Sequence, residues 1–212
     1  MSIQLNLPYS AMVNKFIAKT KFYERVNIST KLQNEFIRYI QRITWKYKLS
    51  EATIGISKTA KVEEIQIFEI ELKEQKIPVN TLRVIDKTIP YPILYIFTYK
   101  ENIAFGISLK EDHKILDYYF SEWNEVIEFD FTGINLEIFY QKLIKAFLGK
   151  QFQPIQDFKK SISLDSRIRA IEKEIKTLSS KITKLKQFNR KVELNKTLLV
   201  RKKELKELKG KL

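Results

Sequence analysis

Hydrophobic and polar positions change period several times along the first 150 residues. Behind Ser29-Thr30, apolar side chains recur at helical spacing (Leu32, Phe36, Ile40 and Ile43). This spacing predicts a helix from Leu32 to Lys48, and Ser or Thr is a preferred N-cap residue. In VEEIQIFEIELK, the apolar Phe68, Ile70 and Leu72 alternate with the charged Glu69, Glu71 and Lys73, so Val62–Lys73 is predicted as the strongest strand.

Shorter patterns between turn residues predict the other elements of this segment. Helices are expected at Ala11–Ala18, Asn80–Lys87 and Leu136–Leu148, and strands at Ala52–Ser57, Ile93–Thr98, Ile103–Leu109, Lys114–Phe120 and Val126–Phe131. The second and third of these strands form a hairpin around Lys100-Glu101-Asn102. The order of elements predicts an α+β domain, with a mainly antiparallel sheet and flanking helices, at residues 1–150.

The end of the chain has the period of a coiled coil. From Leu164 to Leu185 the apolar residues are spaced by alternating steps of four and three, and no Gly or Pro interrupts residues 155–209. This predicts one long helix, Leu164–Leu212, of about 73 Å. Residues 161–212 are therefore assigned to a basic coiled-coil helix, behind a linker at 151–160. Isoleucine at a and mostly leucine at d favour a parallel homodimer, whose predicted seam is Ile168, Ile171, Ile175, Leu178, Ile182, Leu185 and Asn189.

The seam weakens after Leu185. The same register would place Lys196 and Lys203 at a, whereas a different register of leucines suits the last third better: Leu194, Leu198, Leu205, Leu208 and Leu212. A change of phase, or packing on something other than a twin helix, would explain this shift.

Positive charge is concentrated in the same segment. Residues 159–212 contain 18 Lys and Arg against six Asp and Glu, a net charge of +12, out of +14 for the whole chain. Such a cationic rod fits non-specific contact with the DNA backbone, an acidic protein partner, or a solvated surface. The predicted contact residues are Lys173, Lys176, Lys184, Arg190, Lys191, Arg201 and Lys202.

Catalytic candidates are confined to Glu69, Glu71 and Lys73. A Glu-x-Lys motif at a strand end is half of a metal-dependent nuclease site, in which carboxylates hold Mg²⁺ and lysine assists the attacking water. The expected strand before it has no carboxylate, so charges on the wet face of a strand are the competing interpretation. Trp45 and Trp123 are expected to be packing residues.

Composition limits the other chemistry. The chain has no Cys and one His, His113, in an expected turn, so no thiolate or His-based metal site and no cofactor is expected. No phosphate-binding glycine loop, signal peptide or membrane span is evident, and the most apolar stretch, Ile89–Tyr99, is far too short to span a bilayer. These features lead us to expect a cytoplasmic protein.

Several segments resemble an uncharacterised bacterial domain-of-unknown-function family (number four-three-nine-one). They are LPYSAMVNKFIAKTKFY, ITWKYKLS, EIQIFEIELK, VIDKTIPYPILYIF, SEW and KQFNRKVELN. The resemblance implies a protein encoded beside the DNA methyltransferases and helicase-type ATPases of restriction or phage-defence loci. It supplies no catalytic residues.

Together these features favour a non-catalytic accessory subunit of such a DNA-processing system. Its body would dock on a helicase- or methyltransferase-type partner, and its basic helix would dimerise and contact DNA or that partner. A metal-dependent nuclease is the alternative, and an inhibitor or antitoxin-like protein with an acidic partner is a third possibility.

Overall fold

A computed structural model describes residues 5–149, 152 and 157–210. The chain divides into two compact units, Met1–Phe147 and Leu148–Leu212, and each is described by itself. Half of the expected linker at 151–160 lies outside the described residues, and the chain is already helical from Phe158. No described helix has both the length and the apolar character that crossing a bilayer requires.

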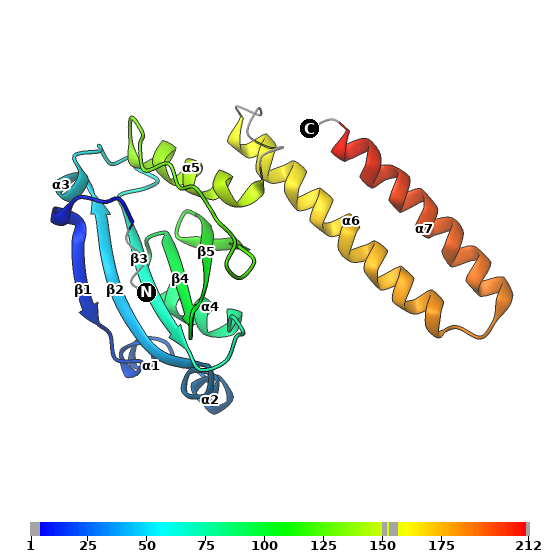
Figure 1. Ribbon diagram of the computed structural model, residues 1–212, viewed down its shortest axis with the longest axis horizontal. Helices are drawn as coiled ribbons and strands as arrows, with labels where there is room; N and C mark the ends of the chain where they lie inside the picture. Colours follow the sequence, from blue (N-terminus) through cyan, green and yellow to red (C-terminus); the bar gives the residue numbers. More distant parts are fainter. Residues whose placement is uncertain (1–4, 150–151, 153–156, 211–212) are drawn as a thin grey trace. The chain divides into compact units, whose positions relative to one another are not determined.

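The first unit is built on a six-stranded mixed sheet whose strands follow the order of the chain (Figure 1). The strands are β1 (Met12–Phe16), β2 (Ile40–Ser50), β3 (Glu64–Leu72), β4 (Ile93–Tyr99), β5 (Asn102–Glu111) and β6 (Lys114–Phe120). Only β3 and β4 are parallel, because the helix α4 (Val79–Thr88) carries the chain back across the sheet between them. The other pairs are antiparallel, so the α+β class and the mainly antiparallel sheet are confirmed.

Helices cover both faces of this sheet. On one face α1 (Thr20–Arg25), α2 (Thr30–Tyr39) and α4 enclose the main core through buried residues such as Phe22, Phe36 and Leu82. Helix α5 (Leu136–Leu148) is tied to the other face by a chain of aromatic rings: Phe147 contacts Phe129, which contacts Phe105 of β5 edge-to-face. The result is three layers, with the sheet in the middle.

The strand β2 corrects the largest error of the sequence prediction. Helix α2 has Ser29 as its N-cap, as predicted, but it ends at Tyr39, and Ile40–Ser50 is a strand. Register shifts interrupt its pairing with β3 between Ile40 and Arg42 and between Trp45 and Tyr47. Bulges add residues to one strand, so the buried positions of β2 fall three and four apart and imitate a helix.

Three shorter predictions also fail. The helix expected at Ala11–Ala18 is a 3-10 turn, η1 (Tyr9–Ala11), followed by the edge strand β1. The strand expected at Ala52–Ser57 is instead a short helix, α3 (Glu51–Ile54), which a Ser50–Thr53 capping box starts and Gly55 ends at φ +69°. Residues 126–131, expected as a strand, have no regular structure, because Phe129 and Phe131 serve as packing side chains for Phe105 and Phe139.

The second unit is a helical hairpin. Helices α6 (Phe158–Lys184) and α7 (Phe188–Lys209) lie side by side and run in opposite directions (Figure 1). The single long helix predicted from the sequence is therefore wrong: the chain leaves helical geometry at Leu185, where φ is −78° and ψ is 136°. This is the place where the heptad register changes, so the change of phase marks a reversal of the chain.

Candidate nucleic-acid interface

The inner side of the hairpin is closed by apolar side chains and ion pairs. The leucine register of the last third points inward: Leu194, Leu198 and Leu205 are partly buried, and Leu208 is buried. On α6, Ile168 and Ile171 are buried, and the later members of the predicted seam are partly buried. The leucines of α7 and the α6 part of the predicted seam are therefore both wholly or partly buried within a single chain.

Among the described residues, three ion pairs cross from α6 to α7 and fix their antiparallel register. Arg167 binds Glu204 at 2.9 Å, Glu172 binds Lys209 at 2.8 Å, and Glu174 binds Arg201 at 3.0 Å. Arg201 also binds Glu204 at 2.7 Å. Hydrogen bonds from Arg167 and Arg201 lower the pKa of Glu204, and those to Glu204 and Glu174 raise the pKa of Arg201.

The predicted contact residues separate into two groups in this arrangement. Five have exposed side chains on the hairpin: Lys173, Lys176, Lys184, Arg190 and Lys202. Lys191 is partly buried, and Arg201 is engaged with two carboxylates, so its charge stabilises the hairpin. Lys196 and Lys203, which one continuous register would place in a seam, are exposed to solvent on α7.

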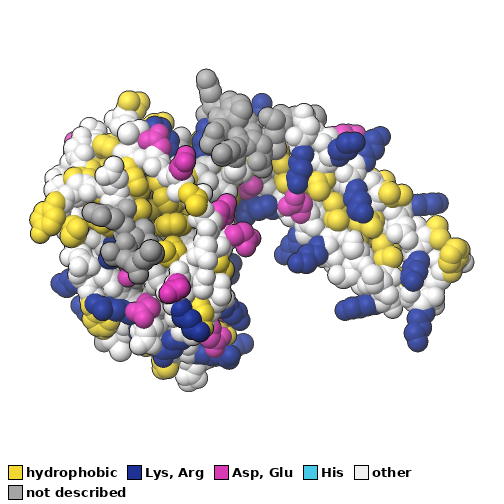
Figure 2. All heavy atoms as spheres, viewed as in Figure 1, with side chains coloured by type: hydrophobic (Ala, Val, Ile, Leu, Met, Phe, Trp, Pro, Cys, Tyr) yellow, Lys and Arg dark blue, Asp and Glu magenta, His cyan; other side chains and the backbone are white. Residues whose placement is uncertain are grey.

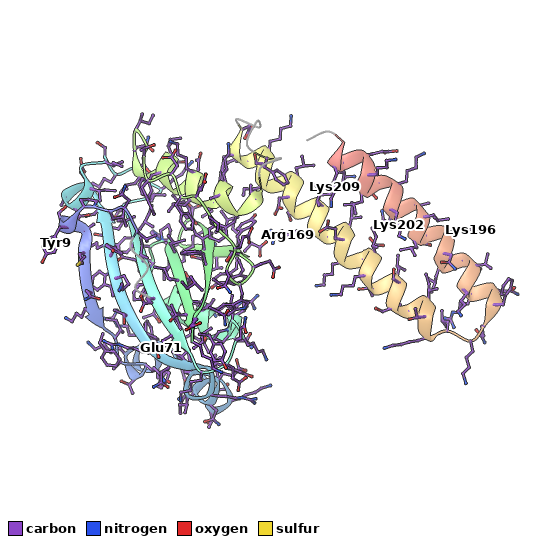
Figure 3. All side chains as sticks on the ribbon, in the orientation of Figure 1. Tyr9, Glu71, Arg169, Lys196, Lys202 and Lys209 are labelled. Atoms are coloured by element: carbon purple, nitrogen blue, oxygen red, sulfur yellow. The ribbon has the colours of Figure 1, made fainter. Side chains whose placement is uncertain are left out.

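The surface of the hairpin is accordingly cationic. Lys and Arg side chains project from it along its length in Figure 2, and Lys196, Lys202 and Lys209 follow one another along α7 in Figure 3. Four of the six acidic residues of this segment form ion pairs within the hairpin: Asp165, Glu172, Glu174 and Glu204. The outward lysines are therefore balanced by few carboxylates.

The predicted dimer seam has a different environment from the one expected. Its α6 members line the side that carries the cross-helix ion pairs, and Asn189 lies exposed in the first turn of α7. A parallel homodimer through these residues is not tested by a single chain, and it stays a prediction.

The Glu-x-Lys motif lies where β3 ends. Glu69 pairs with Lys46 of β2 at 3.3 Å, Glu71 is exposed (Figure 3), and the Lys73 ammonium donates to the carbonyl of Ile37 at 2.8 Å. Among the described residues, no group of three or more His, Cys, Asp or Glu side chains could hold a metal ion. Glu69 is thus in a cross-strand ion pair and Lys73 is bonded to a backbone carbonyl, as is ordinary for charges on the half-exposed face of a strand.

A buried polar cluster, which the sequence did not indicate, joins α4 to the sheet. The Asp86 carboxylate accepts hydrogen bonds from the hydroxyls of Tyr95 (2.8 Å) and Tyr118 (2.7 Å) and pairs with the Lys110 ammonium at 2.9 Å. Lys110 also donates to the carbonyls of Ile89 and Tyr91.

Burial sets the proton affinities in this cluster. Desolvation lowers the pKa of Lys110, against the opposing attraction of Asp86, and raises the pKa of Tyr95 and of Tyr118. With side-chain exposures of 2% and 0%, Lys110 and Asp86 are sealed from any substrate, so the cluster acts as a structural clamp.

A cavity of about 530 Å³ opens on the α1 side of the sheet. Trp45 and Phe68, which stack at 6.4 Å, contribute to its wall, and Lys15, Lys21 and Arg25 line it with exposed side chains. Trp45 and Trp123 both pack against the core, as expected, but Trp45 also faces this space. The sequence gives no sign of the cavity, because its residues come from five separate elements, β1, α1, β2, β3 and α4, and the loops beside them.

One lining group of the cavity has an unmet hydrogen-bonding capacity. The Gln66 amide nitrogen donates to Glu64 at 3.0 Å, which fixes the amide orientation, because a carboxylate accepts only. No donor among the described residues reaches the buried Oε1 of Gln66. An unmet buried acceptor costs about 1–3 kcal/mol and requires an explanation.

Comparison with known proteins gives a family and nothing closer. No curated protein and no solved structure matches the chain. A family model described as Domain of unknown function (DUF4391) matches residues 5–205, which includes the sheet, its helices and most of the hairpin. This match extends over nearly the whole chain and agrees with the resemblance of its motifs. The chain therefore belongs to the DUF4391 family.

Proposed function

We propose that this protein is a nucleic-acid-binding accessory subunit whose α6–α7 hairpin contacts the phosphate backbone of DNA. The observation that carries the proposal is the surface of the hairpin: its acidic residues are mostly engaged in internal ion pairs, while five of the predicted contact cations are exposed. Lysine presents a point charge to phosphate, so this binding is weakly sequence-specific.

The dimensions of the hairpin support a DNA target over a compact acidic protein. At 1.5 Å per residue, the 27 residues of α6 extend about 40 Å and the 22 residues of α7 about 33 Å. One turn of B-DNA is about 34–36 Å long, so a hairpin can follow phosphates over about one turn. An acidic protein partner is the other outcome that the experiment below separates.

The wider role is part of the same proposal. The resemblance implies relatives encoded beside methyltransferases and helicase-type ATPases. On that ground we propose a subunit of a restriction or phage-defence system that docks on such an enzyme and forms a homodimer. The nuclease alternative receives no support from the described carboxylates, since Glu69 is paired with Lys46 and Glu71 belongs to no group of three or more possible metal ligands among the described residues.

The test compares two variants with the same loss of charge. In the hairpin variant, Lys173, Lys176, Lys184, Arg190 and Lys202 become Gln. In the control, five exposed lysines of the first unit become Gln: Lys31, Lys58, Lys87, Lys100 and Lys114. Binding to a fluorescent 20-base-pair duplex is followed by anisotropy at about 50 to 200 mM salt.

We expect the wild-type binding constant to fall steeply with salt, by about 0.9 logarithmic units per phosphate contact for each tenfold increase in salt concentration. The hairpin variant should bind more weakly and with a shallower salt slope, whereas the control should keep the wild-type slope. Equal effects of both variants, or no binding by the wild-type chain at low salt, would remove the DNA role from the hairpin.

A further inference from the structure

We propose that the cavity beside α1 binds a nucleotide, with its base against Trp45 and Phe68 and its phosphate held by Lys15, Lys21 and Arg25. This site is independent of the hairpin and does not rest on the function proposed for it. The argument depends on three properties of the cavity: its aromatic wall, its unmet acceptor and its cationic rim.

The sheet itself builds the aromatic wall. Lys15, Trp45 and Phe68 are direct register partners on β1, β2 and β3, so their side chains form one row on the same face. The rings of Trp45 and Phe68 are nearly parallel, at an interplanar angle of 12°. Partly exposed Trp45 thus presents a flat surface of the kind on which nucleobases stack.

An irregularity in β1 brings the first cation into this row. The pairing of β1 with β2 shifts register between Met12 and Lys15, and Asn14 between them has a φ of +47°. Asn adopts the left-handed region more readily than most residues, and such bulges commonly re-aim a side chain. The shift places Lys15 opposite Trp45, at the mouth of the cavity.

The other two cations come from one face of α1. Lys21 and Arg25 are four residues apart, hence neighbours on the helix surface, and both line the cavity with exposed side chains. None of the three cations has an ion-pair partner within the described part of the chain. The one lining carboxylate near them, Glu64, is already neutralised by Lys48 at 2.6 Å.

The buried amide of Gln66 supplies the polar recognition. Glu64 holds its nitrogen, and its backbone N–H donates to the carbonyl of Pro92 at 2.9 Å, so the side chain is fixed at both ends. Its Oε1 is buried without a donor among the described residues, and a base seated deeply enough to reach it would donate to it, because every common base carries an N–H or amino donor on its edge. The volume of about 530 Å³ lies within the usual range of about 300–1,000 Å³ for small-molecule sites.

Both a free nucleotide and a nucleotide at the end of a strand have this chemistry, and titrations distinguish them. AMP, GMP, ribose 5-phosphate and a 5′-phosphorylated oligonucleotide are titrated separately into the full chain by calorimetry, up to about 1 mM. One variant carries Lys15→Gln, Lys21→Gln and Arg25→Gln, and its matched control carries Lys58→Gln, Lys100→Gln and Lys114→Gln. A second variant carries Gln66→Leu, and thermal unfolding verifies that each variant is folded.

We expect the rim variant to weaken AMP or GMP binding by about tenfold or more, and the control to leave it unchanged. Gln66→Leu should weaken binding of the mononucleotides but leave ribose 5-phosphate, which has no base, unaffected. Binding of the oligonucleotide alone, lost in both cavity variants, would assign the site to a strand end.

Two results would overturn the proposal. One is the absence of binding by every nucleotide ligand, and the other is binding that the rim variant and Gln66→Leu leave unchanged. If the oligonucleotide binds and only the hairpin variant weakens it, the cavity proposal fails while the proposed function of the hairpin stands.

Discussion

A pair of spin labels tests whether α6 and α7 pair within one chain. The chain has no native Cys, so Arg167→Cys and Glu204→Cys give two unique labelling sites. These residues are 37 positions apart, and one continuous helix would separate them by about 55 Å. In the hairpin their side chains meet at 2.9 Å across helices whose axes, when packed, are about 8–10 Å apart.

The substitutions themselves should leave the hairpin intact. They remove two solvent-accessible ion pairs, Arg167–Glu204 between the helices and Arg201–Glu204 within α7, and such pairs contribute little to stability. The leucine packing and the other cross-helix pairs, Glu172–Lys209 and Glu174–Arg201, remain. Labels at Arg167→Cys and Lys184→Cys serve as a control, because both sites lie on α6 and their separation, about 26 Å, is the same in either arrangement.

Pulsed electron paramagnetic resonance measures both distances. We expect the 167–204 distance to be less than half of the value for one continuous helix, and to persist when labelled protein is diluted with unlabelled chain. A distance near 55 Å would refute the hairpin. A short distance that disappears on dilution would show that the two helices pair between chains.

The buried cluster around Asp86 gives two further predictions. Asp86→Ala should lower the free energy of unfolding in urea by about 3–5 kcal/mol, because it leaves the Lys110 ammonium buried without its carboxylate; adding Lys110→Met should recover part of the loss, and simple addition of two losses would contradict the pairing. The second prediction concerns pH: burial raises the pKa of Tyr95, Tyr118 and Tyr140, so the unfolded chain releases these protons at a lower pH than the folded chain does. Above about pH 10.5 the free energy of unfolding should therefore fall, by up to about 1.4 kcal/mol per pH unit for each tyrosine. The lowered pKa of Lys110 has the opposite effect, but only up to 10.5, its pKa in the unfolded chain. Circular dichroism of urea unfolding from pH 9 to pH 12 measures this, and a flat profile would contradict it.

Turn residues at the ends of the apolar runs made the centre of the sheet predictable, whereas bulges concealed β2. Strands β3 to β6 and helices α4 and α5 were expected within a few residues of where they lie, because each is an apolar or amphipathic run with turn residues near its ends. Two turn residues with positive φ, Asp112 and His113, close the last hairpin, so the expected turn is confirmed. By contrast, the bulges of β2 give its apolar residues a helical spacing that no single-period template identifies as a strand.

The candidate sites divide in the same way. The cationic tail was visible because its residues are adjacent in the sequence, although the internal pairing of Arg201 needed the hairpin. The cavity was not visible, because Lys15, Trp45 and Gln66 become neighbours only through strand register. The unpaired amide oxygen of Gln66 has no signature in the sequence, because the orientation of that amide depends on where the fold places Glu64.

The hairpin also changes what a homodimer of this chain would require. Three residues, Leu185 to Gln187, connect α6 to α7, so each helix meets the other at the high effective concentration of a short tether. A second chain that used the isoleucine and leucine stripe of α6 would have to displace α7, with loss of the Leu208 packing and the three cross-helix ion pairs. At ordinary protein concentrations the tethered helix has the advantage in this competition. Homodimerisation, if the labelling confirms the hairpin, must therefore use a surface other than the heptad stripe that predicted it.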